Sequence, residues 1–267
     1  IDGNGFIATI KKGSIYNLEL ADSTIKLNRK KNNIKVESLL HTFGEFNFPQ
    51  FKKVSFLLGF NTDKLKEVNG KADLKTKINF HINNKFKVKN LSYLTEGVVN
   101  HIEIHTEEKR IIRKYLPEYD PKIIIKDVNI KIINSKSNQK AELEGLIKAK
   151  NDFDSIKIIE SYNYDKKSFE VNGAIDLTNS KVQISELNFN KDFGKKSEVS
   201  FDVNFVLNKH YNINKLNFFA DENKINLSNV KLNNNFEVEN FESLKIETFK
   251  NKIKNNDFLA KKSKKII

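Results

Sequence analysis

Two histidines and one glutamate alternate with isoleucine along the segment His101-Ile102-Glu103-Ile104-His105. In a β-strand, alternate residues share one face, so two imidazoles and a carboxylate could meet there at a divalent metal ion. The same alternation is typical of a solvated face opposite two buried isoleucines, and this is the interpretation that we favour. The sequence thus predicts no metal site and no cofactor.

Other groups with catalytic potential are dispersed along the chain. Neighbouring acids occur as Glu107-Glu108 and as Asp152 with Asp154, where a helix start and a solvated loop explain them. Acid–base catalysis requires a carboxylate whose pKa a cleft has shifted, and no pattern indicates burial of these acids. Cysteine is absent, which excludes thiolate nucleophiles and zinc–thiolate sites. With no serine elbow and no glycine-rich phosphate loop either, we interpret the protein as non-enzymatic.

The net charge of the 267-residue chain is +13, from 47 Lys+Arg and 34 Asp+Glu. A basic protein favours anionic partners such as lipid head groups or nucleic acid. Nucleic-acid readers rely on arginine and cluster their charge, whereas this chain has only Arg29, Arg110 and Arg113, and its lysines are spread throughout. Abundant Lys, Asn, Ile and Phe are also what an AT-rich genome imposes. Nucleic acid is therefore not expected as a partner.

Apolar and polar residues alternate with a period of two through most of the chain. Leu74, Thr76, Ile78, Phe80 and Ile82 form one such series, and segments 128–132, 201–208 and 225–232 repeat it. This period is typical of strands with one dry face and one wet face. Asparagine-rich turns between the segments predict antiparallel pairing.

One segment departs from this pattern. Residues 106–116 begin with Thr106, carry acids first and bases last, and precede Pro117 and Pro121, which is typical of a short helix. We therefore divide the chain into an N-terminal β-hairpin segment (1–105), a short helix and connector (106–121) and a C-terminal β-hairpin segment (122–267), together forming one continuous groove. The chain has no methionine and opens within an expected strand, so we interpret it as an internal fragment of a longer protein.

A sheet with one apolar face must bury that face, and a single short helix cannot cover it. A second sheet, closure of the sheet on itself, or curling into a trough would each serve. We predict an all-β protein with a long, twisted, mostly antiparallel sheet of short hairpins, curled into an open groove, with about one short helix. The alternative is a structural β-sandwich or solenoid module with a closed core and no ligand.

The C-terminal half carries a series of residues with a known counterpart. Phe189, Lys191 and Gly194 form an aromatic-x-Lys-x-x-Gly element, and alternating strands follow it. Over residues 165–267 this arrangement resembles the AsmA-like family, in particular its YhdP-type branch with the TamB relatives. Residues 1–105 share with it only the recurrent hydrophobic-x-Gly pattern at the starts of strands. The family's N-terminal transmembrane helix has no counterpart here, which a fragment would explain.

This resemblance implies a periplasmic protein of a Gram-negative bacterium, tethered to the inner membrane by a segment outside this chain. It implies a groove that conducts phospholipid acyl chains towards the outer membrane, with partners at both membranes outside the fragment and no catalytic residues. The residues expected to contact lipid point inward on the clearest strands: Ile78, Phe80, Ile82, Val88, Val203, Phe205, Leu207, Ile213, Leu216, Ile225 and Leu227.

Overall fold

The structure of the chain is a computed structural model. It describes residues 5–16, 18–30, 33–58, 62, 65–106, 110–148, 152–206, 209–235 and 237–262.

Strands dominate these residues, with two α-helices and one 3-10 turn between them. The elements up to residue 134 are β1 (Gly5–Ile15), β2 (Leu18–Lys30), β3 (Asn33–Phe46), α1 (Phe48–Leu58), β4 (Leu65–Asn83), β5 (Val88–Thr106), α2 (Arg110–Tyr115) and β6 (Lys122–Asn134). The elements that follow are β7 (Asn138–Lys148), β8 (Asp154–Asn163), β9 (Ser168–Asp176), β10 (Val182–Ile184), η1 (Ser185–Leu187), β11 (Phe189–Lys191), β12 (Ser197–Val206), β13 (His210–Ala220), β14 (Asn223–Leu232), β15 (Val238–Asn240), β16 (Ser243–Lys250) and β17 (Ile253–Lys261).

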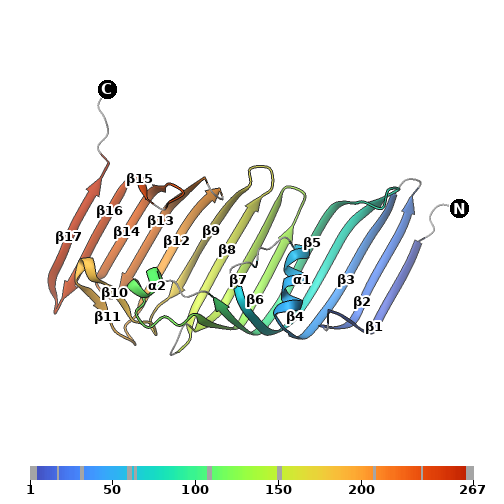
Figure 1. Cartoon of the computed structure of the whole chain (residues 1–267), viewed down its shortest axis with the longest axis horizontal. Coiled ribbons are helices and arrows are strands. Elements are labelled where there is room, and N and C mark those ends of the chain that lie inside the picture. The colour runs from blue at the N-terminus through green and yellow to red at the C-terminus, as the bar shows by residue number, and fades with distance from the viewer. Residues whose placement is uncertain are drawn as a thin grey trace, which may run out of the picture. The chain divides into compact units, whose positions relative to one another are not determined.

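Fifteen strands form one sheet in which almost every strand lies beside its neighbours in sequence (Figure 1). The order runs from β1 to β9, continues with β12, β13, β14, β16 and β17, and places β15 against β14. Strands β10 and β11 leave this order and form a separate two-stranded sheet. Because β1 and β17 each have a single neighbour, the sheet is open. The predicted all-β class with an open antiparallel sheet is confirmed, although β4 and β5 reach 19 residues each and are longer than the short hairpins expected.

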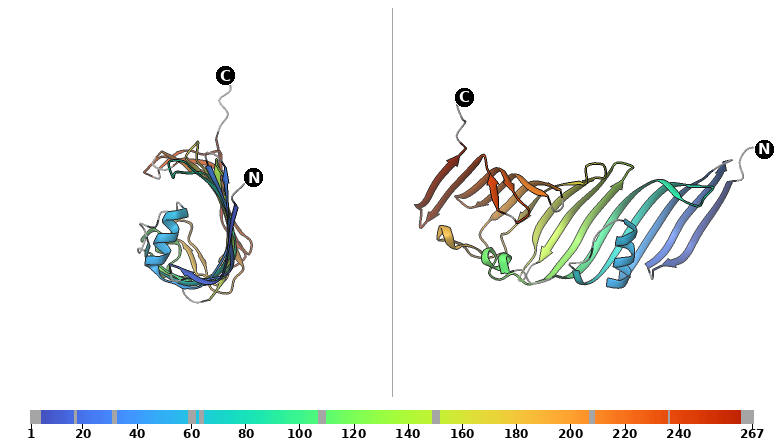
Figure 2. Two further views of the ribbon diagram at one scale, coloured as in Figure 1. Left: turned by 90° about the vertical axis from the view of Figure 1, so that its right-hand side faces the viewer. Right: turned by 45° about the horizontal axis from the view of Figure 1, so that its top comes forward.

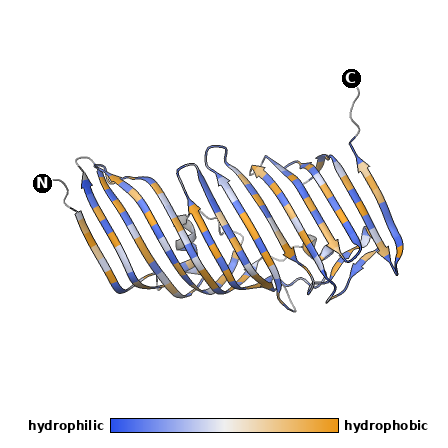
Figure 3. Cartoon of the chain, turned by 180° about the vertical axis from the view of Figure 1, so that it is seen from behind, coloured by the Kyte–Doolittle hydropathy of each residue, from blue (hydrophilic) through white to orange (hydrophobic). Residues whose placement is uncertain are grey.

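Alternating side chains explain these strands. In β4, the even-numbered residues from Val68 to Leu74 are more buried than the odd-numbered residues between them. Figure 3 shows the same alternation as orange and blue bands along the strands. Each strand therefore presents one apolar and one polar face, as the sequence predicts.

β-Bulges keep the apolar residues on one face where the alternation in the sequence slips. Asp22 and Asn90 lie at register shifts of the β2–β3 and β4–β5 pairs, both with positive φ. Asn229 in β14 also has positive φ, and it separates Leu227 from Val230 on the same face. Asparagine and aspartate tolerate the left-handed region better than other non-glycine residues, which suits them to bulges.

Helix α1 is an element that the sequence analysis missed. Asn47 and Gln50 cap its first turn reciprocally, because the backbone N–H of Asn47 donates to Gln50 Oε1 (2.7 Å) and the N–H of Gln50 donates to Asn47 Oδ1 (3.3 Å). This is a capping box. The predicted helix within 106–116 is observed as α2, whereas residues 107–109 lie outside the described residues.

The chain divides into two compact units. The first comprises Ile1–Glu107 with Lys122–Gly145, and the second comprises Glu108–Pro121 with Leu146–Ile267. This division places β6 with the N-terminal strands, whereas the sequence analysis places it in the 122–267 segment.

The first unit is a curved sheet with α1 on its concave side (Figure 2). Its core lies between the apolar face and the residues beside α1: Ala72, Val99 and Val128 are buried, and Phe46 packs against them. The rings of Phe46 and Phe51 stack at a centroid distance of 6.1 Å, which joins the helix to the sheet.

The second unit has its own cover, formed by β10 and β11. Val182 and Phe189 from this hairpin pack against Phe218 and Ala220 of β13. The rings of Phe189 and Phe218 meet edge to face at 5.8 Å. The hairpin therefore covers one end of the apolar face of this unit.

Candidate functional site

Four aromatic side chains lie side by side across four strands of the second unit. Tyr162 of β8 pairs with Phe169 of β9, Phe169 with Phe205 of β12, and Phe205 with Tyr211 of β13. The ring centroids are 4.5, 4.9 and 5.6 Å apart in that order, and the last two pairs are stacked. We call these four residues the aromatic ladder. All four are half-buried, and they lie next to the β8–β9 and β12–β13 turns.

The next row along the same strands is apolar except at one position. Val171, Val203, Ile213 and Val230 are aligned by the strand register, and Glu160 of β8 pairs with Val171. The Glu160 side chain is half-buried and has no hydrogen-bond partner among the described residues. Burial raises the pKa of this carboxyl above its ordinary value. The apolar face of this unit therefore contains one carboxyl group with an unusual environment.

Two further rows complete this face. Phe201, Leu216 and Leu227 align in the third row, and Phe218 and Ile225 belong to the fourth, where the β10–β11 hairpin packs. The hairpin thus covers the fourth row. The aromatic ladder, at the opposite ends of the strands, has no part in this buried cluster.

The apolar face of the first unit carries a smaller set of polar groups. The hydroxyls of Thr76 and Thr95 lie 3.0 Å apart on adjacent strands. The buried Gln139 amide donates to the Tyr93 hydroxyl at 2.5 Å. These groups satisfy one another, so this face remains suited to apolar contacts.

The predicted lipid contacts fall on these apolar faces. The second unit places six of them on one face: Val203, Phe205, Ile213, Leu216, Ile225 and Leu227. The first unit places Ile78, Phe80, Ile82 and Val88 together, with Val88 opposite Ile82. Val88 is 53% exposed, whereas the other nine side chains are half-buried. Leu207 lies outside the described residues.

The chain exposes more surface than a compact protein of its mass. Its accessible surface is 17662 Å² for 30.9 kDa, whereas a compact monomer of that mass exposes about 12,000 Å². A single-layer sheet explains the excess, because each unit has only a small helix or hairpin over its apolar face.

Sequence reasoning missed three of the four ladder residues and Glu160. The signal in the sequence is Ile156-x-Ile158-x-Glu160-x-Tyr162, where an acid occupies an apolar position of an alternating series. The register that brings Phe169 next to Phe205 has no local signal, because β10 and β11 interrupt the chain between β9 and β12.

In the histidine and glutamate series of β5, Glu103 is the residue with polar partners. Glu103 Oε1 accepts from His105 Nε2 at 3.0 Å and from Lys122 Nζ at 2.8 Å. These two partners hold the pKa of Glu103 below its usual value. His101 is exposed and does not contact Glu103 or His105 in this way. Within the described parts of the chain, no three His, Asp or Glu side chains converge as a metal site would require.

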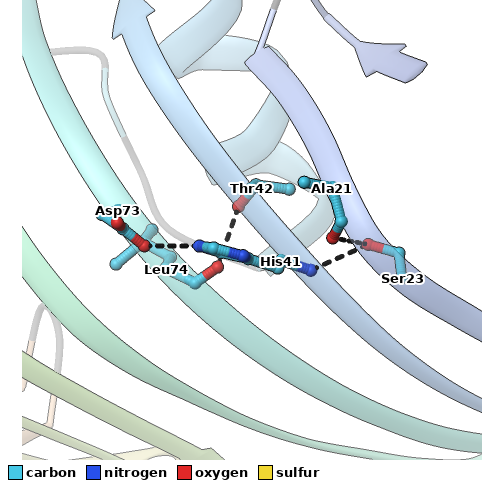
Figure 4. Close-up of polar contacts among 6 residues, drawn as sticks. All are labelled: Ala21, Ser23, His41, Thr42, Asp73 and Leu74. Carbon is cyan, nitrogen blue, oxygen red and sulfur yellow. Dashed lines mark hydrogen bonds and ion pairs between the residues drawn. The ribbon is translucent and has the colours of Figure 1, made fainter. Parts of the chain in front are cut away.

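A serine, a histidine and an aspartate lie close together on β2, β3 and β4 (Figure 4). His41 Nε2 lies 2.7 Å from Asp73 Oδ1. The Ser23 hydroxyl, however, accepts from the backbone N–H of His41 at 2.9 Å and donates to the carbonyl of Ala21. Because Ser23 contacts the backbone and not the imidazole ring, the three residues do not form a nucleophile–base relay.

Asp154 corrects one interpretation from the sequence. The sequence places it in a solvated loop, but it is buried at the start of β8, where it accepts from the N–H of Asn179 (2.8 Å) and from the Ser180 hydroxyl (3.0 Å). Burial is the main cause that raises the pKa of this carboxyl. Asp154 thus holds the loop before β10 in place.

Lys191 holds the same loop from the other side. Its side chain is buried, and its Nζ donates to the carbonyls of Leu177, Thr178 (2.9 Å) and Ser180 (2.7 Å). Gly194 adds a bond from its N–H to the carbonyl of Thr178 (2.9 Å). The three residues of the aromatic-x-Lys-x-x-Gly element therefore have structural roles, since Phe189 packs in the core beneath them.

A cavity of about 610 Å³ lies at strand ends of the first unit. It is lined by Glu45, Phe46, Asn47, Gln50, Asn69, Gly70, Lys71, His101 and Glu103. Its charged groups are of both signs, and Glu103 is already engaged by Lys122 and His105. This mixture offers no converging set for one ligand chemistry.

No family model, curated protein or solved structure matches this chain. In the described residues, no helix is long and apolar enough to cross a membrane.

Proposed function

We propose that the protein binds phospholipid acyl chains on its apolar sheet faces and conducts them along a groove, without catalysis. The observation that carries this proposal is the set of apolar rows in the second unit, from the aromatic ladder to Leu216 and Leu227, whose apolar side chains are half-buried except for the buried Val230. In a closed core such residues would be fully buried. Burying an acyl chain there yields about 0.8 kcal/mol per CH₂, so a stretch of ten methylenes would contribute about 8 kcal/mol.

The wider setting follows the resemblance to the AsmA-like family. In this proposal the protein is periplasmic, is tethered to the inner membrane by a segment outside this chain, and contributes to lipid transport to the outer membrane and to its integrity. Partner proteins at either membrane also lie outside the chain. The polar faces of the sheet would remain in water while the lipid tails follow the apolar rows.

Phe205→Asp tests the proposal. The new carboxylate would lie between Phe169 and Tyr211 in the aromatic ladder, where an acyl chain would have to desolvate it. We expect loss of crosslinking to a photoactivatable phospholipid, with the strand content by circular dichroism unchanged. Asn226→Asp is the matched control, because Asn226 lies on the polar face between Ile225 and Leu227. Crosslinking that survives in Phe205→Asp would favour the structural module with a closed core.

A further inference from the structure

The tip of the β4–β5 hairpin combines an exposed aromatic ring with lysines. Phe86 is 86% exposed, the highest value among the large hydrophobic residues described. It lies in the sequence Lys85-Phe86-Lys87-Val88-Lys89, in which all five residues are exposed. We call residues 83–89 the basic hairpin tip.

The tip is a built turn that presents Phe86 outward. Asn83 Oδ1 accepts from the backbone N–H of Lys85 (3.0 Å) and of Lys87 (2.9 Å). The N–H of Phe86 donates to the carbonyl of Asn83 (2.9 Å). Phe86 has φ +55°, a conformation that disfavours a bulky side chain and favours Gly or Asn. A strained aromatic residue that makes no core contact indicates a role outside folding.

The hairpin also projects beyond its neighbour. β6 pairs with β5 only from Tyr93 onward, so Val88 and the four residues after it lie past the end of β6. At the strand rise of about 3.3 Å per residue, the tip extends roughly 16 Å beyond that strand. On its other side the tip is level with the end of the β2–β3 hairpin, since Asn83 pairs with Asn33.

The charge around the tip has one sign. No acid occurs between Asp73 and Glu96, and none between Asp22 and Glu37 in the adjacent β2–β3 hairpin. Lys85, Lys87 and Lys89 form no ion pair with any described residue. Arg29 is exposed at the same end, since Lys30 and Asn83 both lie beside Asn33.

We propose that the basic hairpin tip docks on an anionic phospholipid membrane, with the Phe86 ring inserted among the acyl chains and the lysines at the head groups. An apolar ring flanked by lysines matches the layering of a membrane interface, with the ring at the level of the acyl chains and the ammonium groups at the head groups. This surface role goes beyond the proposed function and does not depend on it, because Phe86 and the three tip lysines are not among the predicted lipid contacts, to which only Val88 of the tip belongs.

Tryptophan fluorescence provides the direct test, because the chain contains no tryptophan. In the full chain, Phe86→Trp places a single reporter at the tip. Vesicles of phosphatidylcholine with phosphatidylglycerol should shift its emission to the blue and protect it from an aqueous quencher, whereas vesicles of phosphatidylcholine alone should not. Tyr16→Trp is the matched control: Tyr16 is also an exposed aromatic residue with positive φ, in the β1–β2 turn at the opposite end of β2.

Vesicle cosedimentation gives the second readout. Phe86→Asn should lower the affinity for phosphatidylglycerol vesicles about tenfold or more, and replacing the three tip lysines with glutamine should lower it roughly 100-fold, at about fivefold per lysine. Phe86→Asn also suits the φ of this position, so its fold should be retained. An unshifted Phe86→Trp emission, equal binding by Phe86→Asn, or a response to duplex DNA in place of vesicles would each overturn the proposal.

Discussion

Replacing Lys191 with methionine should loosen the loop that joins β9 to β10. Methionine keeps the length and the apolar stem of the side chain but removes the ammonium group, so the carbonyls of Leu177, Thr178 and Ser180 lose a common donor. A buried polar group without a partner costs about 1–3 kcal/mol. The carbonyls of Leu177 and Thr178 each keep one donor, from the N–H groups of Ser180 (3.0 Å) and Gly194 (2.9 Å), whereas the Ser180 carbonyl loses its donor. One such carbonyl gives a loss of about 2 kcal/mol.

Hydrogen exchange measures this loss where it occurs. At 1.36 kcal/mol per factor of ten, about 2 kcal/mol corresponds to a roughly 30-fold drop in protection. The drop should appear in peptides that cover residues 177–194, including the amide of Gly194, which donates to Thr178. Binding of an apolar dye should rise as well, because the β10–β11 hairpin would no longer cover Phe218.

Lys195→Met is the control for this prediction. Lys195 is an exposed lysine four residues after Lys191, in the connection between β11 and β12. Its substitution should leave the protection from hydrogen exchange within about twofold of the unsubstituted protein. If Lys191→Met also changed protection less than about fivefold, or if the loss spread evenly over the whole second unit, the three carbonyl bonds would not be what fixes this loop.

Two further substitutions probe the sheet itself. The pKa of Glu160 is raised in the folded protein, so its contribution to stability is complete below the unfolded pKa near 4.5 and is lost as the pH rises through the folded pKa. Glu160→Gln should remove this decline of the urea midpoint with rising pH. If the urea midpoints of both proteins fell equally with pH, the raised pKa of Glu160 would be contradicted. Gly97→Ala should destabilise the first unit by about 2–3 kcal/mol in urea denaturation, because the added Cβ would lie 2.1 Å from the carbonyl oxygen of Asp73; an unchanged midpoint would show that β5 can move away.

The alternating strands could be predicted from the sequence because their signal is local. Residues 74–82 are an example, since each polar residue lies between apolar ones and one face must therefore be dry. The positions of the β-bulges could not be predicted in this way. The three-residue intervals 213–216 in β13 and 227–230 in β14 are compensated by Asn214 and Asn229, which only the paired strands reveal.

Two other features depended on tertiary context. The segment after Asn47 is rich in apolar residues and was not recognised as α1, although the Asn47 and Gln50 pair is a readable capping signal. The sequence marked Lys191 only as part of the aromatic-x-Lys-x-x-Gly element and did not indicate its burial, because a lysine is normally solvated and its three acceptors come from a loop about a dozen residues earlier. Burial of a charged residue follows from its partners, and these are not visible in the residue's own neighbourhood.

The strand order has a consequence for how the molecule gains and loses structure. Because nearly every strand pairs with the ones adjacent in the chain, most contacts close short loops, which favours rapid folding from any single hairpin. Stability in such an arrangement accumulates hairpin by hairpin, as in repeat proteins. Fraying should then begin at the outermost strands β1 and β17 and advance inward, so that an interior hairpin can remain formed while an end has opened.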